Sequence, residues 1–136
     1  MNAPSIDIQE MLEAEALEDS VFAAKIGKFT VNRAILDETK PNCVRLLDFS
    51  GWKPQLTMDR AKYERPTVQI AVQCVDYDEG WELLSDIIDI LHGKAHEVWN
   101  GSYYSLIECL NGPAFLKREN QRTLFVANFM TQRRPV

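Results

Sequence analysis

The stretch PTVQIAVQCVDYDEGWELLSDIIDILHG, residues 66–93, decides the fold. In its first part, four apolar residues alternate with polar or small ones, the period of a strand with one buried face: Val68, Ile70, Val72 and Cys74. Asp76 then precedes Glu79 by three positions, the spacing of a helix-capping box. A helical pattern follows and ends at Gly93. The stretch therefore predicts a strand that leads directly into a helix.

The predicted helix is amphipathic. Its apolar stripe recurs at steps of three and four residues and consists of Tyr77, Trp81, Leu84, Ile88 and Leu91, widened by Leu83, Ile87 and Ile90. The opposite face is polar and carries Asp78, Glu82, Ser85, Asp86 and Asp89. We expect the stripe to pack against the sheet and the acidic face to meet water or a partner.

Upstream of this unit, residues 5–26 predict a helix with Ser5 as N-cap and Gly27 as its end. The Asp19-Ser20 pair could divide it into two shorter helices. Residues 29–41 predict a short extended piece and a loop. A strand is expected at 43–49, then a turn at 50–54 and an exposed excursion at 55–65.

Downstream, Asn100-Gly101 predicts a tight turn before a strand at 102–110. Asn111-Gly112-Pro113 should end that strand, with a polar connection at 114–122 and a last strand at 123–132. This last strand is apolar on both sides, so we expect a central position in the sheet or a cover from another molecule. The sequence predicts one α+β domain over residues 1–136, in the order α-β-β-α-β-β. An N-terminal helix and the central amphipathic helix pack on a mixed or antiparallel sheet of about four strands.

Composition excludes several classes of protein. The chain has 136 residues and a formal charge of −5, which argues against general nucleic-acid binding because such binding needs a cationic surface. No apolar run approaches the roughly 18–20 residues of a membrane-spanning helix, and residues 1–11 lack the pattern of a signal peptide. We therefore expect a protein that stays in the cytoplasm where it is made and has no contact with a membrane.

The sequence offers little for catalysis, and we expect neither an enzyme nor a cofactor. No nucleotide-binding, metalloprotease or esterase motif is present. Cys43, Cys74 and Cys109 are single and far apart, which favours buried packing over a disulfide or zinc site. His92 and His96 have the spacing of metal ligands, but Gly93 between them should end the helix. The sequence therefore predicts no catalytic, cofactor or metal site.

Basic residues and aromatic residues gather in the predicted loops and at strand ends, where a fold commonly presents contact residues. They either keep the protein soluble or contact an acidic partner, including a second copy of this chain. The candidate interface residues are Arg60, Lys62, Tyr63, Arg65, Lys117 and Arg118, with Asp78, Glu82 and Asp86 from the acidic helix face as the complementary side.

The order of several short motifs resembles the minor capsid and tail-completion proteins of phages, the tail terminators of long-tailed phages. The resemblance covers about residues 25–132. It is carried by Tyr63-Glu64-Arg65-Pro66-Thr67-Val68-Gln69-Ile70, Asp76-Tyr77-Asp78-Glu79-Gly80-Trp81 and Leu91-His92-Gly93, by Pro41-Asn42-Cys43-Val44 with Leu47, by Asn100-Gly101 before Tyr103, and by Asn111-Gly112-Pro113-Ala114-Phe115. Ser50-Gly51-Trp52 stands where the family often has Gly-Gly, so the contacts of the loop at 50–65 stay open.

The resemblance implies an α+β subunit of a ring, typically a hexamer, in the virion. Such a ring caps the tail tube, stops its polymerisation and gives the head connector proteins a docking surface, while DNA passes through the lumen without sequence-specific binding. Assembly would take place in the host cytoplasm. The implied partners are copies of the same chain, the tail tube protein and the connector or neck proteins.

Two other functions stay open at this point. A neck adaptor between head and tail would share the fold and the virion location. A small cellular α+β module could instead bind a ligand between helix and sheet near Trp81 and Trp99.

Overall fold

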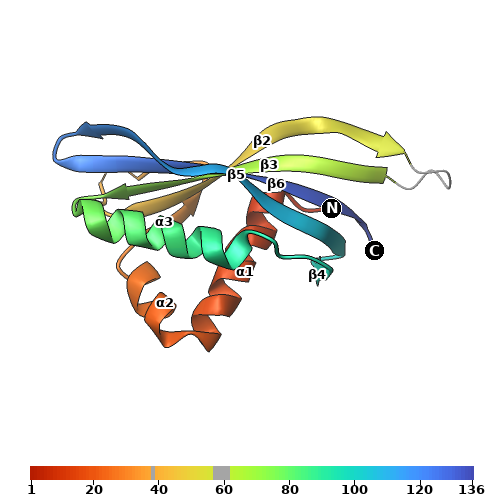
Figure 1. Cartoon of the computed structure of the whole chain (residues 1–136), viewed down its shortest axis with the longest axis horizontal. Coiled ribbons are helices and arrows are strands. Elements are labelled where there is room, and N and C mark those ends of the chain that lie inside the picture. The colour runs from red at the N-terminus through yellow and green to blue at the C-terminus, as the bar shows by residue number, and fades with distance from the viewer. Residues whose placement is uncertain (38, 57–61) are drawn as a thin grey trace.

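The computed structural model describes residues 1–37, 39–56 and 62–136, with backbone only for 50–56 and 62. The three helices of these residues lie on one face of a long, twisted sheet, and no helix of the described ranges covers the other face (Figure 1). The helices are α1 (Pro4–Glu18), α2 (Ser20–Ile26) and α3 (Tyr77–Leu91). No helix in the described ranges is long and apolar enough to span a membrane.

The sheet has six strands in the order β1-β2-β3-β6-β5-β4. They are β1 (Thr30–Arg33), β2 (Cys43–Leu56), β3 (Lys62–Cys74), β4 (Glu97–Trp99), β5 (Ser102–Glu119) and β6 (Arg122–Pro135). Only the β1–β2 pair is parallel, so the sheet is mixed. The α+β class is confirmed, whereas the predicted number of four strands is wrong, because β1 and β4 are too short to give a periodic signal.

The strand-and-helix unit that decides the fold is confirmed. Asp76 caps α3 by accepting hydrogen bonds from the amides of Asp78 and Glu79, and the helix ends at Leu91. The buried stripe is rotated from the predicted one: Tyr77 and Trp81 are 46% and 41% exposed, and the residues facing the sheet are Gly80, Leu83, Leu84, Ile87 and Leu91. At Gly80 the helix lies so close to β3 that a Cβ there would be 2.2 Å from Cys74 Sγ.

The predicted helix over 5–26 is divided at Asp19, as the Asp19-Ser20 pair allowed. Asp19 ends α1 and caps α2, accepting hydrogen bonds from the amides of Val21 and Phe22, and Gly27 ends α2 as predicted. The prediction that Ser5 is the N-cap is wrong. Pro4 occupies the first helical turn and Ala3 is the cap position, so Ser5 lies inside α1, where its side chain is buried.

The two long hairpins correct the predicted turns. No turn occurs at 50–54, since β2 continues to Leu56. Its pairing with β3 shifts register twice, between Phe49 and Trp52 and between Trp52 and Gln55. Likewise Asn111-Gly112-Pro113 does not end the strand, and 114–122 is not a loop. β5 runs on to Glu119 because bulges on either side of Asn111 absorb the extra residues, and Pro113 lies on a sheet edge, where a missing donor is tolerated.

The last strand is central, as its two apolar sides predicted. β6 lies between β3 and β5, and Phe125, Ala127 and Phe129 are fully buried beneath the helices. The core joins these side chains to alternate residues of β2 and β3, to the α3 stripe, and to Ile8, Met11, Leu12 and Phe22 of α1 and α2.

Candidate assembly surfaces

The β2–β3 and β5–β6 hairpins extend from the sheet in opposite directions (Figure 1). The predicted basic residues therefore fall into two groups at opposite ends of the molecule. Lys62, Tyr63 and Arg65 belong to the β2–β3 end, and Lys117 and Arg118 belong to the β5–β6 end. A single contact surface made of both groups is not present within one subunit.

At the β2–β3 end, Arg60 lies outside the described residues, and for Lys62 only the backbone is described. Tyr63 is tied to the neighbouring strands: its hydroxyl lies 2.6 Å from Ser105 Oγ and donates to Gln132 Oε1 at 3.0 Å. Arg65 is half-buried, and its Nε has no hydrogen-bond partner among the described residues. Tyr63 therefore serves the sheet of its own subunit.

At the β5–β6 end the cations are on the surface. Lys117 forms an exposed pair with Glu119 at 3.4 Å, and the Arg118 guanidinium donates across the hairpin to the Thr123 hydroxyl. Exposed pairs of this kind add little to stability because water screens them. Lys117 is therefore available to a carboxylate on another molecule.

The acidic residues of α3 differ in their surroundings: one pairs within the subunit, and two face solvent. Asp86 pairs with Lys25 of α2 at 2.7 Å, and this hydrogen bond raises the pKa of the lysine. The pair links α2 to α3 within the subunit. Asp78 and Glu82 are exposed and remain the members of the predicted acidic side that face solvent.

An exposed aromatic surface, which the sequence analysis missed, lies where β5 runs past the start of α3. Tyr77, Trp81 and Phe115 pack around the buried Phe125, with ring centroids 4.9, 5.7 and 6.3 Å from it. Leu116 beside them is 58% exposed and Phe115 is 53% exposed. We refer to Tyr77, Trp81, Phe115 and Leu116 as the aromatic edge. Exposed apolar groups gathered in one place are typical of contact sites. The signal in the sequence is the run Ala114-Phe115-Leu116, which lies within the predicted polar connection at 114–122.

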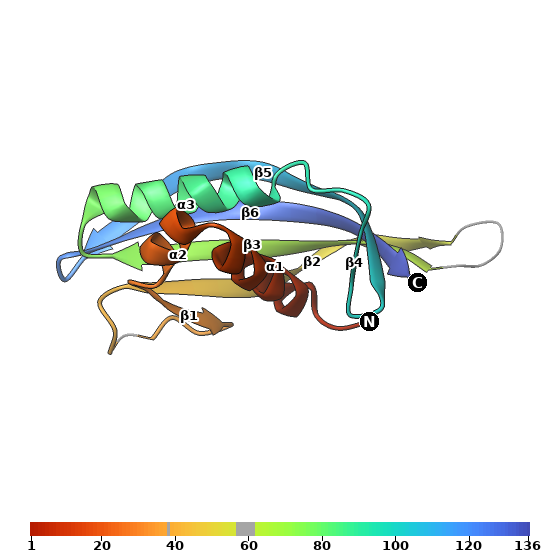
Figure 2. The ribbon, with the colours of Figure 1, turned by 90° about the horizontal axis from the view of Figure 1, so that it is seen from below.

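A second apolar surface lies toward the opposite edge of the sheet, between α1, α2 and β1. This helical groove has a volume of about 130 Å³, and its lining is Gln9, Leu12, Glu13, Ala16, Ile26 and Val31. In Figure 2, α1 and α2 lie toward the β1 side of the sheet, whereas α3 lies over β5 and β6. The aromatic edge and the helical groove are thus unlike surfaces on opposite sides of one subunit.

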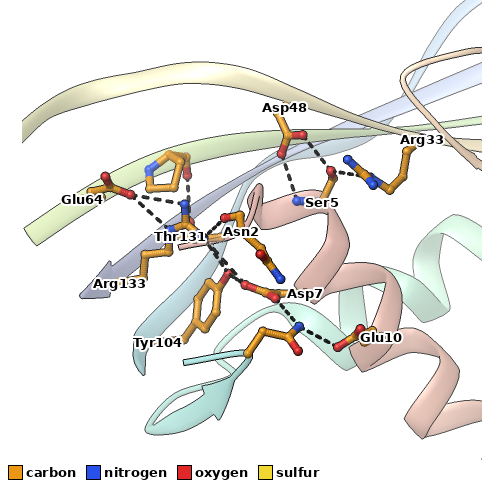
Figure 3. A network of polar contacts seen from close by, with 12 residues as sticks. Asn2, Ser5, Asp7, Glu10, Arg33, Asp48, Glu64, Tyr104, Thr131 and Arg133 are labelled. Carbon is orange, nitrogen blue, oxygen red and sulfur yellow. Dashed lines mark hydrogen bonds and ion pairs between the residues drawn. The ribbon is translucent and has the colours of Figure 1, made fainter. Parts of the chain in front are cut away.

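The first turns of α1 are fixed to the sheet by a buried polar network (Figure 3). Asp7 is fully buried, accepts hydrogen bonds from the Tyr104 hydroxyl and from Asn100 Nδ2, and lies 3.7 Å from the Arg133 guanidinium. Burial, followed by the contact with Asp7, raises the pKa of Tyr104, so the phenol remains a hydrogen-bond donor. Because every member is paired, the network holds the helix in one position.

Further bonds extend this network to β2 and to the N-terminal residues. Arg133 pairs with Glu64 at 3.2 Å and donates to the main-chain oxygen of Asn2 at 2.7 Å. The Ser5 amide and hydroxyl both donate to Asp48, at 2.9 and 2.7 Å. The α1 helix and the C-terminal part of β6 are thereby held together, which fixes one side of the helical groove.

The cysteines and histidines have local structural roles. Burial raises the pKa of all three thiols, that of Cys74 to about 11, which keeps them in the unreactive protonated form. The ring of His92 accepts a hydrogen bond from the Cys109 amide at 2.9 Å, and His96 lies beside Tyr103. Within the described residues, no cluster of three or more His, Cys, Asp or Glu side chains could hold a metal ion.

The space proposed for a ligand near Trp81 and Trp99 is filled. Leu83, Leu84 and Ile87 are fully buried between α3 and the sheet, and the Trp81 ring packs edge-on against Phe125. Trp99 lies on β4, beyond the end of α3, where its indole donates to Glu97. The two tryptophans do not line a common cavity.

Comparison with known families agrees with a protein that functions through its assembly surfaces. The sequence profile of the bacteriophage tail terminator proteins matches residues 20–134. The chain belongs to the bacteriophage tail terminator family. It is therefore a structural protein of the phage tail, as the motif order in the sequence implied.

A solved structure extends the similarity to more of the fold. A chain from the structure titled "Virion of native gene transfer agent (GTA) particle" aligns with a TM-score of 0.69 at 14% identity, covering 97% of this chain and 95% of that one. The fold shared by the two chains therefore includes most of α1, which precedes the residues matched by the tail terminator profile. None of the curated protein sequences compared with the chain matches it.

Proposed function

We propose that the chain assembles into a closed ring of identical subunits, a hexamer, in the neck of a phage virion. The ring caps the tail tube, ends its polymerisation and gives the head connector proteins a surface on which to dock. Assembly takes place in the host cytoplasm before the ring enters the virion. The family match over residues 20–134 is the observation that carries this proposal.

The surfaces of the subunit support the ring. A ring of identical copies needs two different, complementary surfaces on each copy. The aromatic edge and the helical groove are two unlike apolar surfaces on opposite sides of one subunit. The family match favours a terminator over a neck adaptor, and the filled space beneath α3 disfavours a ligand-binding module.

The net charge supports the passage of DNA through the ring. The chain carries a formal charge of −5, and an acidic lumen repels the phosphate backbone. DNA would then slide through the lumen without binding to it. Asp78 and Glu82 are exposed acids that could contribute to such a surface.

Growth of tail tubes tests the capping function. Tail tube protein from the same phage is polymerised alone and with increasing amounts of the purified chain, and tube lengths are measured by electron microscopy. We expect shorter tubes with additional density at one end. Tubes of unchanged length with bare ends at every concentration would contradict the proposal.

The predicted basic residues of the β2–β3 end receive a separate test. We propose that Arg60, Lys62 and Arg65 contact an acidic surface of another virion protein or of a second copy. Reversing the charge of Arg60 and Lys62 should weaken the assembly, as measured by light scattering. An unchanged assembly mass would remove these residues from the interface.

A further inference from the structure

We propose that neighbouring subunits meet by insertion of the aromatic edge of one copy into the helical groove of the next. Leu116 of the first copy occupies the space between α1, α2 and β1 of the second. The occupant of the groove is therefore a second copy of this chain. The inference rests on the ring proposed above and specifies its subunit contact.

The β5 strand presents Leu116 outward. Phe115 pairs with Phe125 and Lys117 pairs with Leu124, so Leu116 is the extra residue of a bulge. A bulge on an edge strand redirects a side chain away from the sheet. Leu116 is 58% exposed. Among the described residues no strand lies beyond this part of β5, since β4 pairs only with Ser102–Tyr104. The strand therefore carries an apolar side chain that its own subunit does not cover.

The helical groove suits a side chain of this kind. Leu12, Ala16, Ile26 and Val31 make its lining apolar, and its volume is about 130 Å³. That volume corresponds to about four water molecules at a liquid share of about 30 Å³ each, which is room for one aliphatic side chain. Filling it with Leu116 removes apolar surface of both copies from water.

The charges around the two surfaces are complementary. The α1 helix contains five acidic residues and no basic one, and Glu13 lies exposed at the rim of the groove with no ion pair or hydrogen bond among the described residues. Around Leu116, the end of the hairpin carries three basic residues and one acidic residue: Lys117, Arg118, Arg122 and Glu119. Lys117 is 55% exposed and follows Leu116 directly. Insertion of Leu116 would bring Lys117 toward Glu13 of the neighbour.

The placement of the surfaces gives the contact its direction. The aromatic edge lies at β5, near one edge of the sheet, and the groove lies at β1, the opposite edge. In Figure 2, β5 and β1 lie at opposite edges of the sheet. Each copy can therefore contact one neighbour through its edge and another through its groove, and such a head-to-tail contact closes into a ring when the rotation per subunit allows it.

Site-specific photocrosslinking tests the contact. A chain with p-benzoylphenylalanine in place of Leu116 is mixed with an isotopically labelled wild-type chain, assembled and irradiated. We expect links to residues 9–31 of the labelled copy. The matched control carries the photocrosslinker in place of Val98, which is 59% exposed on β4, and should give few links to that segment.

A charge exchange gives a second, independent test. Lys117→Glu and Glu13→Lys should each raise the dissociation constant of the assembly about fivefold, as expected for charges at the rim of an interface. The double variant should return to within about twofold of the wild type, because the pair is restored in the opposite sense. Additive losses in the double variant would contradict the pairing.

The outcomes separate this inference from the proposed function. Rings or tube caps that form while position 116 links only to other segments would overturn the edge-to-groove contact and leave the terminator function in place. A chain that neither assembles nor shortens tubes would overturn both. Links to residues 9–31 of another copy, together with rescue by the double variant, would establish the contact.

Discussion

Helices α1 and α3 have the same length, 15 residues each, yet they are held on the sheet in different ways. The α3 helix lies along β5 and β6 and buries an apolar stripe, of which Leu83, Leu84 and Ile87 are fully covered. The α1 helix is fixed at its first turns by the polar network around Asp7, and its second half diverges from the sheet (Figure 1). Each helix borders one of the two proposed assembly surfaces.

The difference has a consequence for assembly. A helix packed along its whole length leaves no space beneath it, and the exposed large apolar side chains of α3 are Tyr77 and Trp81, near its start. A helix anchored at one end leaves a groove beside its other half, which is lined by Leu12 and Ala16. The polar network is therefore expected to determine the shape of the groove.

The largest expected loss of stability comes from breaking the buried polar network that holds the first turns of α1. Asp7→Ala leaves the buried guanidinium of Arg133 with one carboxylate partner fewer and the Tyr104 hydroxyl without its acceptor. Removal of one partner from a buried ionic network destabilises a protein by about 3–5 kcal/mol. Urea unfolding followed by circular dichroism measures the loss. Glu13→Ala on the same helix is the control and should change stability by less than about 0.5 kcal/mol. Equal effects of the two substitutions would show that the network does not hold α1.

A comparable substitution beneath α3 should act through packing alone. Leu84 is fully buried, and Leu84→Ala should reduce the free energy of unfolding by about 2–5 kcal/mol through lost apolar burial and a cavity. The same urea titration measures it, with the exposed Glu82→Ala as control. A loss below about 1 kcal/mol would indicate that α3 is not packed on the sheet as described.

A substitution where α3 closely approaches β3 should destabilise the fold by a smaller amount, part of which a second substitution should recover. A Cβ at Gly80 would lie 2.2 Å from Cys74 Sγ, so Gly80→Ala should destabilise the fold by about 1–3 kcal/mol through overpacking. Adding Cys74→Ala removes the obstructing sulfur and should recover part of the loss. Failure of the second substitution to recover any stability would place the clash elsewhere.

A further expected change concerns assembly and not folding. Leu116→Asp places a charge in the proposed apolar contact and should weaken subunit association by at least about tenfold, or about 1.4 kcal/mol. Because Leu116 is 58% exposed in the single subunit, the unfolding temperature of the dilute monomer should stay within about 2 °C of the wild type. Val98→Asp is the matched control. Light scattering across a dilution series measures association, and a wild-type dissociation curve for Leu116→Asp would remove this residue from the interface.

The same contrast between the helices explains what the sequence could predict. The α3 helix and β3 follow regular apolar periods, so their bounds could be predicted from Val68 through Leu91. The anchor of α1 joins residues separated by 97 and 126 positions, Asp7 with Tyr104 and with Arg133, and no local pattern signals such pairing.

The site was less predictable than the fold for a related reason. The bulges in β5 interrupt the alternation of apolar and polar residues, so 114–122 resembled a loop and Phe115 and Leu116 were missed. The structure ties Asp86 and Tyr63 to partners within the subunit, which sequence spacing alone could not reveal.

Electron microscopy of the chain assembled on tail tubes tests the central claim most directly. We predict a closed ring at one end of each tube, in which the β5 side of every subunit faces the α1–α2 side of the next. Pairs of subunits joined through identical surfaces, or tube ends without any ring, would contradict the account.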